Sequence, residues 1–342
     1  MKEALLYEKL ASNKVRCRLC AHGCTIAEGK TGICHVRRND GGTLYTLVYG
    51  RTIAQNVDPI EKKPLFHFHP GSKAYSIATP GCNFRCGWCQ NAEISQMPGE
   101  RHLAAGRAAS PEEIVAAAQQ AGCGSIAYTY TEPTIFFEYS YDTARRAREA
   151  GIANIYVTNG FMTQEALETI HPCLDAANVD LKAFRDDTYR QHVGARLQPV
   201  LDSLKTMKRL DIWVEVTTLV IPGLNDGPEE LRDAARFVAR ELGPHTPWHI
   251  SRFAPAHKFR DLPPTPVATL RQARDIGREE GLHYVYLGNI PGEADTTCHS
   301  CGRVLVRRHG FAGAQVQVTA EGQCPGCGTP VAGVGMAPPA EG

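Results

Sequence analysis

The chain lacks the features that mark membrane proteins and nucleic-acid-binding proteins. Its 342 residues contain no apolar run that approaches the length needed to span a bilayer. The formal net charge is only +1, so no excess of one sign attracts nucleic acid or an anionic membrane surface. The beginning of the chain, MKEALLYEKLASNKVRC, scatters charges through short apolar stretches and is not a secretory signal. We therefore expect a cytoplasmic protein with no nucleic-acid or membrane partner.

A glycine-rich dinucleotide fingerprint is also absent, although the middle of the chain alternates strand-like and helix-like patterns. No Gly-x-Gly-x-x-Gly follows a predicted strand, which disfavours a Rossmann fold. Strict alternation predicts an α/β fold with a parallel sheet, and periodicity alone does not separate a barrel from an open sheet. We expect strands at 74–79, 125–130, 154–158, 178–183, 212–221, 248–253 and 283–288. We expect helices at 111–120, 134–149, 163–171, 186–209 with a break near Gly194, 228–241 and 266–280.

Cysteine, by contrast, is abundant, and most of it falls into three groups. Thirteen cysteines would indicate disulfides only in an oxidising compartment. Cys123 and Cys173 stand apart, and we expect both to be buried core residues. The groups are Cys17, Cys20, Cys24 and Cys34; Cys82, Cys86 and Cys89; and Cys298, Cys301, Cys324 and Cys327.

The middle group lies in the segment 81–91, GCNFRCGWCQN, where three residues and then two separate the cysteines. Three thiolates can hold three irons of a [4Fe–4S] cube and leave the fourth iron open to a small molecule. The alternative is a structural metal clip or an electron-transfer cluster, but such sites usually have four protein ligands and two-residue gaps. The spacing, with Trp88 directly before the last cysteine, resembles the fingerprint of the radical SAM enzymes.

This resemblance implies both a fold and a chemistry. Radical SAM cores are partial (β/α)6 barrels with the cluster after the first strand. It implies that Cys82, Cys86 and Cys89 hold a [4Fe–4S] cluster whose open iron binds S-adenosylmethionine (SAM). It further implies one-electron cleavage of SAM to a 5′-deoxyadenosyl radical, with electrons from a flavodoxin-type or ferredoxin-type reductant.

Polar residues follow the other predicted strands, at the carboxyl ends where parallel α/β folds bind ligands. Asp180 and Lys182 are two residues apart and therefore share one face of a strand, where the pair can match a zwitterionic ligand. The remaining candidates for cofactor binding are Glu132, Asn159, Thr217, His249 and Arg252, together with Trp88.

The segments around these residues resemble those of the glycyl-radical-enzyme activases. Similar Thr-Asn-Gly and Asp-Leu-Lys segments occur in that group, as does the segment 59–65 (PIEKKPL) before the cluster. The resemblance assigns Asn159, Asp180 and Lys182 to SAM binding. It gives Glu132 the place of the motif that binds the SAM amino group, and His249 a place against the ribose or adenine.

The two outer cysteine groups read as further metal sites. The C-terminal group is two Cys-x2-Cys knuckles separated by 22 residues, which is typical of a zinc ribbon, and a rubredoxin-like iron site has the same ligands. The N-terminal group, Cys-x2-Cys-x3-Cys-x9-Cys, is less regular, with His22 and His35 nearby. We expect a metal site with four cysteine ligands there. The sequence does not decide between zinc and a second [4Fe–4S] cluster.

These features divide the chain into three parts: a cysteine-rich N-terminal lobe (1–72), a radical SAM core (73–291) and a zinc-ribbon-like lobe with a tail (292–342). The end-to-end set resembles the radical SAM proteins of the AmmeMemoRadiSam system, which implies two companion protein families as partners.

The leading functional hypothesis is a radical SAM enzyme that abstracts hydrogen from a small-molecule substrate, with both outer lobes closing the barrel mouth. One alternative is activation of a protein partner as a glycyl radical. Another is an electron-transfer or metal-handling protein without SAM chemistry. A third is cleavage of a different carbon–sulfur bond of SAM.

Overall fold

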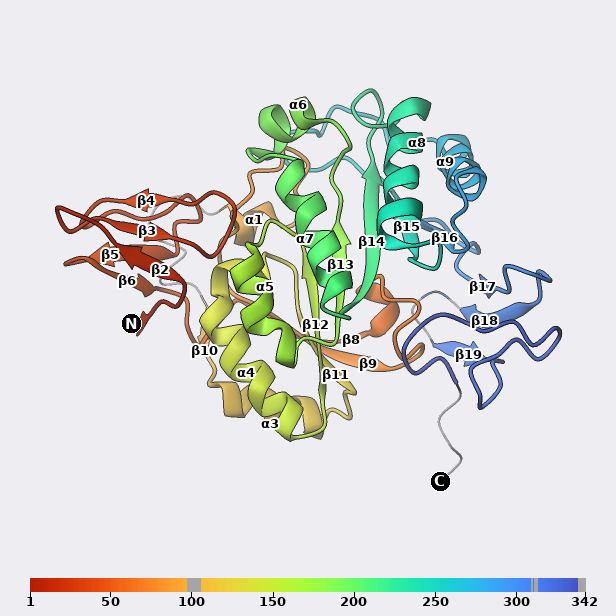
Figure 1. Cartoon of the computed structure of the whole chain (residues 1–342), viewed down its shortest axis with the longest axis horizontal. Coiled ribbons are helices and arrows are strands. Elements are labelled where there is room, and N and C mark those ends of the chain that lie inside the picture. Colours follow the sequence, from red (N-terminus) through yellow and green to blue (C-terminus); the bar gives the residue numbers. More distant parts are fainter. Residues whose placement is uncertain (97–105, 309, 311–312, 338–342) are drawn as a thin grey trace.

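A mostly parallel eight-stranded sheet forms the centre of the computed structural model, which describes residues 1–96, 106–308, 310 and 313–337 (Figure 1). All neighbouring strands are parallel except the first pair, β8 and β9. The sheet is open, because β8 and β16 are both edge strands. In spatial order it contains β16 (Val285–Gly288), β15 (Trp248–Arg252), β14 (Trp213–Val220), β13 (Ala176–Asp180), β12 (Ala153–Thr158), β11 (Ser125–Tyr128), β9 (Lys73–Ala78) and β8 (Ala54–Pro59).

Helices connect the successive parallel strands, as the alternation predicts. Ser110 opens α3 with a capping box to Glu113, and the Thr163 side chain caps α5. Gly194, at φ 76°, ends the turn before α7, which confirms the predicted break. The helices are α1 (Ala92–Ser95), α3 (Pro111–Gln120), α4 (Phe137–Glu149), α5 (Gln164–Ile170), α6 (Asp186–Thr188), α7 (Gln198–Arg209), α8 (Pro228–Phe237) and α9 (Val267–Glu279).

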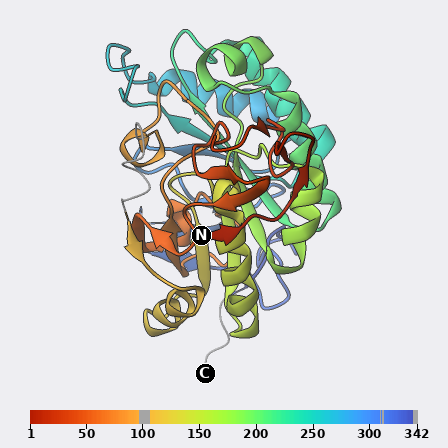
Figure 2. The same ribbon diagram turned by 90° about the vertical axis from the view of Figure 1, so that its left-hand side faces the viewer.

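The cysteine-rich beginning of the chain, here called the N-lobe (residues 1–50), consists of two small antiparallel sheets. One contains β1 (Lys2–Glu3), β6 (Thr43–Thr46) and β5 (Arg37–Asp40), and the other contains β2 (Tyr7–Lys9), β3 (Val15–Cys17) and β4 (Thr25–Ile26). Its next strand, β7 (Arg51–Thr52), pairs with β10 (Arg107–Ala108). Figure 2 faces the N-lobe and shows it in front of the central sheet and its helices.

A buried ion pair fixes the N-lobe to the core. Arg37 donates to both carboxylate oxygens of Glu138 on α4, at 2.9 and 3.2 Å, and both side chains are almost completely buried. The Leu5 backbone N–H donates to the same carboxylate at 2.7 Å. Bidentate pairing satisfies two charges that would be costly to bury singly.

The segment after β8, here called the base segment (residues 60–72), packs against the sheet near the amino ends of its strands. Glu215 of β14 is buried, and its carboxylate accepts from the backbone N–H groups of Phe66 and His67 at 3.0 and 2.7 Å. His249 of β15 donates to the same carboxylate at 2.6 Å. These hydrogen bonds hold the base segment against β14 and β15.

The C-lobe (residues 292–337) docks onto this base segment. It contains β17 (Thr296–Thr297), β18 (Val304–Arg308) and β19 (Ala314–Val316). Arg308 is buried, donates to the Phe66 carbonyl at 2.6 Å and lies over the Phe66 ring. Its guanidinium is also 3.6 Å from Glu61. Figure 1 places the two lobes on opposite sides of the central sheet, and residues 338–342 of the expected tail lie outside the described residues.

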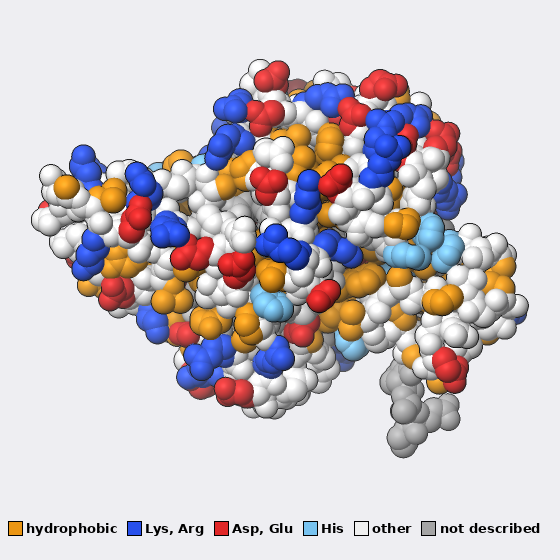
Figure 3. Space-filling model, viewed as in Figure 1, with side chains coloured by type: hydrophobic (Ala, Val, Ile, Leu, Met, Phe, Trp, Pro, Cys, Tyr) orange, Lys and Arg blue, Asp and Glu red, His pale blue; other side chains and the backbone are white. Residues whose placement is uncertain are grey.

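The surface agrees with the balanced charge of the sequence. Figure 3 shows acidic and basic side chains interspersed on the face in view, with histidines gathered toward the C-lobe. The rings of His245, His283 and His299 contact one another at centroid distances of 4.0–5.9 Å. None of the described helices combines the length and the apolar character that crossing a lipid bilayer requires.

Candidate active site

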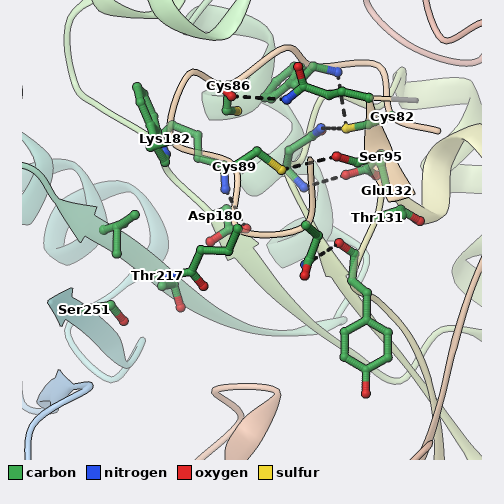
Figure 4. Close-up of a pocket in the computed structure, with 18 of the residues that line it drawn as sticks. Cys82, Cys86, Cys89, Ser95, Thr131, Glu132, Asp180, Lys182, Thr217 and Ser251 are labelled. Atoms are coloured by element: carbon green, nitrogen blue, oxygen red, sulfur yellow. Dashed lines mark hydrogen bonds and ion pairs between the residues drawn. The ribbon is translucent and has the colours of Figure 1, made fainter. Parts of the chain in front are cut away.

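A cavity of about 290 Å³ lies at the carboxyl ends of the parallel strands. Figure 4 shows the three cysteines of the predicted cluster loop in this cavity, with the side chains of Glu132, Lys182, Asp180 and Thr217 around them. Of the predicted site residues, those that line this cavity are Cys82, Cys86, Cys89, Trp88, Glu132, Asn159, Asp180, Lys182 and Thr217.

The cluster loop begins directly after β9 and is held from several sides. Gly81 has a φ of 104°, which favours glycine, and a Cβ there would lie 2.9 Å from Val36 of the N-lobe. The backbone N–H groups of Arg85 and Gly87 donate to carbonyls at the end of the helical turn 189–193. The loop therefore presents its three thiols in a fixed arrangement before any ligand binds.

The thiols themselves are surrounded by donors. The Phe84 backbone N–H donates to Cys82 Sγ at 3.3 Å, and Ser95 lies 3.2 Å from Cys89 Sγ. Burial raises the pKa of Cys82, and the nearby Glu132 carboxylate raises it further. Such thiols become good ligands only when a metal replaces the proton, and hydrogen bonds to the sulfurs then tune the cluster.

Glu132 is buried and joins the segments that follow β11 and β12 through hydrogen bonds. Its carboxylate accepts from the Thr134 backbone and hydroxyl, from the Thr158 hydroxyl and from the Asn159 backbone N–H. Asn159 in turn donates to Asn83 of the cluster loop at 2.7 Å. The network explains how a carboxylate with 1 % exposure is tolerated, and it couples the strand ends to the cysteines.

Asp180 and Lys182 form an ion pair at 2.8 Å on the cavity wall. Burial alone would lower the pKa of Lys182, but the Asp180 carboxylate outweighs it and raises that pKa. Lys182 therefore stays protonated beside the cysteines. The pair can present an ammonium and a carboxylate to a ligand that carries both charges.

Two predicted residues lie elsewhere. His249 shares a face of β15 with Ser251, which does line the cavity, but it lies two residues deeper along the strand. There it donates to Glu215 and packs against Phe66. Arg252 projects to the other face and donates to the Thr265 carbonyl at 2.8 Å. Neither residue belongs to the described cavity lining.

The lining also contains residues that the sequence analysis did not select. Ser251 is the residue before the last one of β15, and Asn289 directly follows β16, both at the edge where ligands are expected. The rule about strand ends points to this region, but it does not tell which neighbouring residue faces the cavity: Arg252, the last residue of β15, does not line it, whereas Ser251 does. Pro64 of the base segment forms part of the floor, which sequence alone gave no reason to expect. The further unpredicted lining residues are Phe84, Gln90, Asn91, Ser95, Gln96, Tyr130, Thr131 and Leu219.

The expectation that both outer lobes close this cavity is wrong for the C-terminal lobe. The described lining contains no residue after 291, whereas Pro64, which belongs to the expected N-terminal lobe (1–72), forms part of it. The C-lobe docks through Arg308 to Phe66, near the amino ends of the strands, whereas the cavity is at the carboxyl ends. The chain after β16 returns past α9, where Glu293 binds Arg271 and Arg274, and this takes it away from the cavity.

The C-lobe cysteines form a compact group. All four sulfurs lie within 4.8 Å of one another, and the pairs Cys298–Cys327 and Cys301–Cys324 are each 3.6 Å apart. Hydrogen bonds from Thr329 lower the pKa of Cys327 to about 6. This group has the ligand number and the spacing of a single-metal site.

The N-lobe cysteines line a second, smaller cavity between the N-lobe and the core. Burial raises the pKa of Cys20 and of Cys34, and neighbouring thiolates raise both further. His22 donates through Nε2 to the Asn83 carbonyl at 2.8 Å, so that nitrogen is already in use. The four predicted cysteines are thus brought together in one place.

Comparisons with known proteins agree with the geometry of the larger cavity. A model of the radical SAM superfamily matches residues 76–238. The chain is 46% identical to the uncharacterized protein MJ0808 of Methanocaldococcus jannaschii, over 96% of this chain and 98% of that protein. It is 24% identical to the pyruvate formate-lyase-activating enzyme of Clostridium pasteurianum, over 53% of this chain and 80% of that one.

Solved structures share the fold. SuiB of Streptococcus suis, bound to S-adenosylmethionine, aligns with a TM-score of 0.51 at 13% identity, over 68% of this chain and 53% of SuiB. A radical SAM methyltransferase of Sphaerobacter thermophilus aligns with a TM-score of 0.50 at 17% identity, over 68% of this chain and 70% of the other. These structures show a shared fold. The match of the radical SAM model and the similarity to the activating enzyme, together with the three cysteines that follow β9, show that the chain is an enzyme of the radical SAM superfamily, with the iron–sulfur and SAM chemistry of that group.

Proposed function

We propose that this enzyme binds a [4Fe–4S] cluster through Cys82, Cys86 and Cys89 and cleaves SAM in the cavity above it. The observation that supports this most is that the three thiols share one cavity with the Asp180–Lys182 pair. When bound, the cluster and SAM supply one-electron cleavage of the sulfonium and a 5′-deoxyadenosyl radical that abstracts hydrogen.

The chain's own residues bind and orient SAM in this proposal. Lys182 and Asp180 face the carboxylate and ammonium of its methionine part, because the pair offers the complementary charges next to Cys86. Glu132 holds the Asn159 backbone, and Asn159 holds Asn83 of the cluster loop. Ser251, Thr217 and Asn289 provide neutral polar groups for the nucleoside part.

Product analysis tests this function. The protein is reconstituted anaerobically with iron and sulfide, then given SAM and dithionite. We expect 5′-deoxyadenosine; methylthioadenosine would indicate that another carbon–sulfur bond breaks. An electron-transfer protein would give neither product and would leave the Asp180–Lys182 pair without a role. A Cys123→Ser variant is the control for general effects of losing a thiol. It should give the same products as the unaltered protein, because Cys123 is buried and does not line the cavity.

The substrate in this proposal is a small molecule. The base segment closes the inner end of the cavity through Pro64, and the remaining volume of about 290 Å³ must also hold SAM. Activation of a protein is the second candidate. It is supported by the similarity to a pyruvate formate-lyase-activating enzyme and by a C-lobe that docks away from the cavity.

Deuterium transfer distinguishes the two candidates. Deuterated small molecules, or purified companion proteins with deuterated glycine, are incubated with enzyme, SAM and reductant. Deuterium in 5′-deoxyadenosine from a protein glycine would replace the small-molecule proposal by an activase. The companion proteins of the AmmeMemoRadiSam system and a flavodoxin-type or ferredoxin-type reductant are the partners proposed for this experiment.

We also propose zinc for the C-lobe cysteines. Tetrahedral zinc with bonds of about 2.3 Å places its four sulfurs about 3.8 Å apart, close to the observed pair distances. The C-lobe buries few apolar residues of its own, so a structural metal would supply much of its stability. Metal analysis of protein from its own host checks the assignment, and iron at this site would refute it.

A further inference from the structure

The N-lobe cysteines surround an internal cavity and do not gather at one point. Cys17, Cys20, Cys24 and Cys34 all line it. Its other walls come from the N-lobe itself, from α4's preceding turn and from the cluster loop. A pocket lined by four thiols on its different sides suits a bound group larger than one ion.

The spacing of the sulfurs differs from that of the C-lobe. Among the described residues, the C-lobe quartet is the group of cysteine, histidine or carboxylate ligands that lies within 4.8 Å. No thiol–thiol contact like the two 3.6 Å contacts of the C-lobe joins N-lobe sulfurs in the described part of the chain. A single zinc or iron, and each iron of a [2Fe–2S] cluster, needs such close pairs, whereas a [4Fe–4S] cube binds each thiolate at its own corner.

The thiols that belong to the superfamily's cluster behave in the same way. Within the described residues, Cys82, Cys86 and Cys89 also do not gather within 4.8 Å, although they line one cavity. The N-lobe quartet therefore resembles the core triad in its spacing and differs from it by one additional thiol. A fourth thiol leaves no iron open for a substrate, which is the pattern of an electron-carrying cluster.

Two buried donors on the cavity wall have no partner. Arg37 is 1 % exposed and lines the cavity, and its Nε makes no hydrogen bond although its other nitrogens bind Glu138 and Leu5. Asn83 is 1 % exposed and lines the same cavity, and its Nδ2 is also without a partner. Unsatisfied buried donors are rare in native proteins, and N–H groups that face an anionic cluster would be satisfied by its sulfurs.

The cavity shares a wall with the core cluster loop. Asn83 is adjacent to Cys82, and its carbonyl accepts from His22 of the N-lobe. Arg85 donates to the carbonyls of both Cys82 and Ile33, and so bridges the two cysteine groups. The Val36 side chain packs so closely on Gly81 that a Cβ there would meet it at 2.9 Å.

We propose that Cys17, Cys20, Cys24 and Cys34 hold a second [4Fe–4S] cluster that relays electrons to the cluster at Cys82, Cys86 and Cys89. The four thiols would hold this cluster beside the core cluster loop. When bound, it would supply a one-electron relay: it would take one electron from a reduced flavodoxin-type or ferredoxin-type carrier and pass one electron to the core cluster, with no bond formed or broken and no proton moved. The relay role depends on the proposed function, whereas the cluster itself does not.

Metal analysis and electron paramagnetic resonance (EPR) of two complementary variants test the site. The double variant Cys20→Ala/Cys34→Ala should fall from about eight irons per chain to about four, and its remaining reduced signal should still change when SAM is added. The triple variant Cys82→Ala/Cys86→Ala/Cys89→Ala should keep about four irons, with a [4Fe–4S] signal that SAM does not change. Cys123→Ala/Cys173→Ala, which removes the two ungrouped cysteines, is the matched control and should keep all the iron.

The results that would overturn the proposal are distinct from those that would overturn the function. Loss of one zinc in the double variant, an iron content equal to the control, or no iron in the triple variant would each refute the N-lobe cluster. A control protein whose signals never respond to SAM would instead refute the proposed function. If the double variant fails to fold, the triple variant still decides the question.

Stopped-flow reduction tests the relay. In the double variant, reduction of the core cluster by reduced flavodoxin should slow at least about tenfold, which corresponds to about 1.4 kcal/mol of activation free energy. Reduction by dithionite, a small molecule that can reach the core cavity directly, should keep its rate. Unchanged rates with both reductants would refute the relay.

Discussion

The N-lobe and the C-lobe each present four cysteines, yet their surroundings differ in every other respect. The C-lobe sulfurs lie within 4.8 Å of one another, and Cys301 and Cys327 are exposed. The N-lobe sulfurs line a cavity next to Cys82, with Arg37 and Asn83 on its wall. The C-lobe docks near the amino ends of the strands, whereas the N-lobe contacts the cluster loop at their carboxyl ends.

This difference shows why a cysteine count does not identify a metal. Both groups offer four thiolates, but in the C-lobe two Cys-x2-Cys knuckles face each other, so that Cys298 lies 3.6 Å from Cys327 and Cys301 lies 3.6 Å from Cys324. The N-lobe ligands come from β3, from two turns and from the segment before β5, so their sulfurs approach from separate directions. The position of each thiol in space, and the donors around it, carry the information about the metal.

The largest expected effect separates the core from both outer sites. Cys86→Ala should abolish SAM cleavage, because two thiolates cannot hold the cube with its open iron in place. Both outer sites should keep their metal in this variant, since neither uses Cys86. Chromatography of 5′-deoxyadenosine, with metal analysis of the same sample, measures both outcomes. Normal cleavage by the variant would end the radical SAM assignment of this cavity.

The docking of the two lobes provides the next test. Arg37→Met leaves Glu138 buried without its partner and should lower the free energy of unfolding by about 3–5 kcal/mol. Arg308→Met, the C-lobe counterpart, should cost less, because Arg308 is 3.6 Å from Glu61, whereas Arg37 makes two hydrogen bonds to Glu138. Denaturant unfolding of both variants compares them. Equal losses would mean that the two interfaces are equally strong.

SAM affinity should depend on the Asp180–Lys182 pair of the core and not on the outer lobes. Asp180→Ala or Lys182→Ala should weaken SAM binding about 10-fold to 150-fold, the equivalent of about 1.5–3 kcal/mol for one charge-assisted contact. Iron and zinc contents should stay near those of the unaltered protein. Calorimetric titration of SAM measures the effect, and unchanged affinity in both variants would assign the pair a structural role.

Acid should loosen the C-lobe more than the N-lobe. Burial is the main cause that lowers the pKa of His67 to about 4 from its ordinary 6.5, and His67 Nδ1 donates to the Ala332 carbonyl of the C-lobe. Below about pH 6.5 the unfolded chain binds a proton that the folded chain does not, so stability present above that pH falls by about 1.4 kcal/mol per unit down to about pH 4.

Hydrogen exchange of C-lobe amides at pH 7.5 and 5.5 measures this dependence, after correction for intrinsic exchange. The matched variant is His67→Asn, whose amide nitrogen has no proton to gain in this range and should flatten the dependence. N-lobe amides should show a smaller change, because burial lowers the pKa of His22 less far than that of His67. A C-lobe slope that survives in His67→Asn would contradict the assignment to His67.

The smallest effect on chemistry is expected from the C-lobe metal. Cys301→Ser/Cys327→Ser should lose one metal per chain and increase amide exchange in the C-lobe. The rate of SAM cleavage should stay unchanged, because the described cavity lining contains no C-lobe residue. A large loss of cleavage would show that this lobe does act on the cavity.

The sequence predicted the elements that repeat and the ligands that are close in the chain. Strand–helix alternation indicated the parallel sheet, and the two-residue spacing of Asp180 and Lys182 placed both on the cavity wall. It could not give the depth of a residue along a strand, so His249, on the same face as Ser251, was expected one layer too high. It also could not place the lobes, because their positions depend on buried contacts such as that of Arg308 with Phe66, which join distant parts of the chain.

The base segment has a consequence for how the protein is made. Its Phe66 N–H binds Glu215, which is 149 residues later in the chain, and its Phe66 carbonyl binds Arg308, which is 242 residues later. During synthesis this early segment must therefore wait, with its apolar side chains unprotected, until β14 and then the C-lobe leave the ribosome. Long-range contacts of this kind slow folding and expose the waiting segment to aggregation. Chains truncated before β18 should for that reason depend on chaperones more than the full-length chain does.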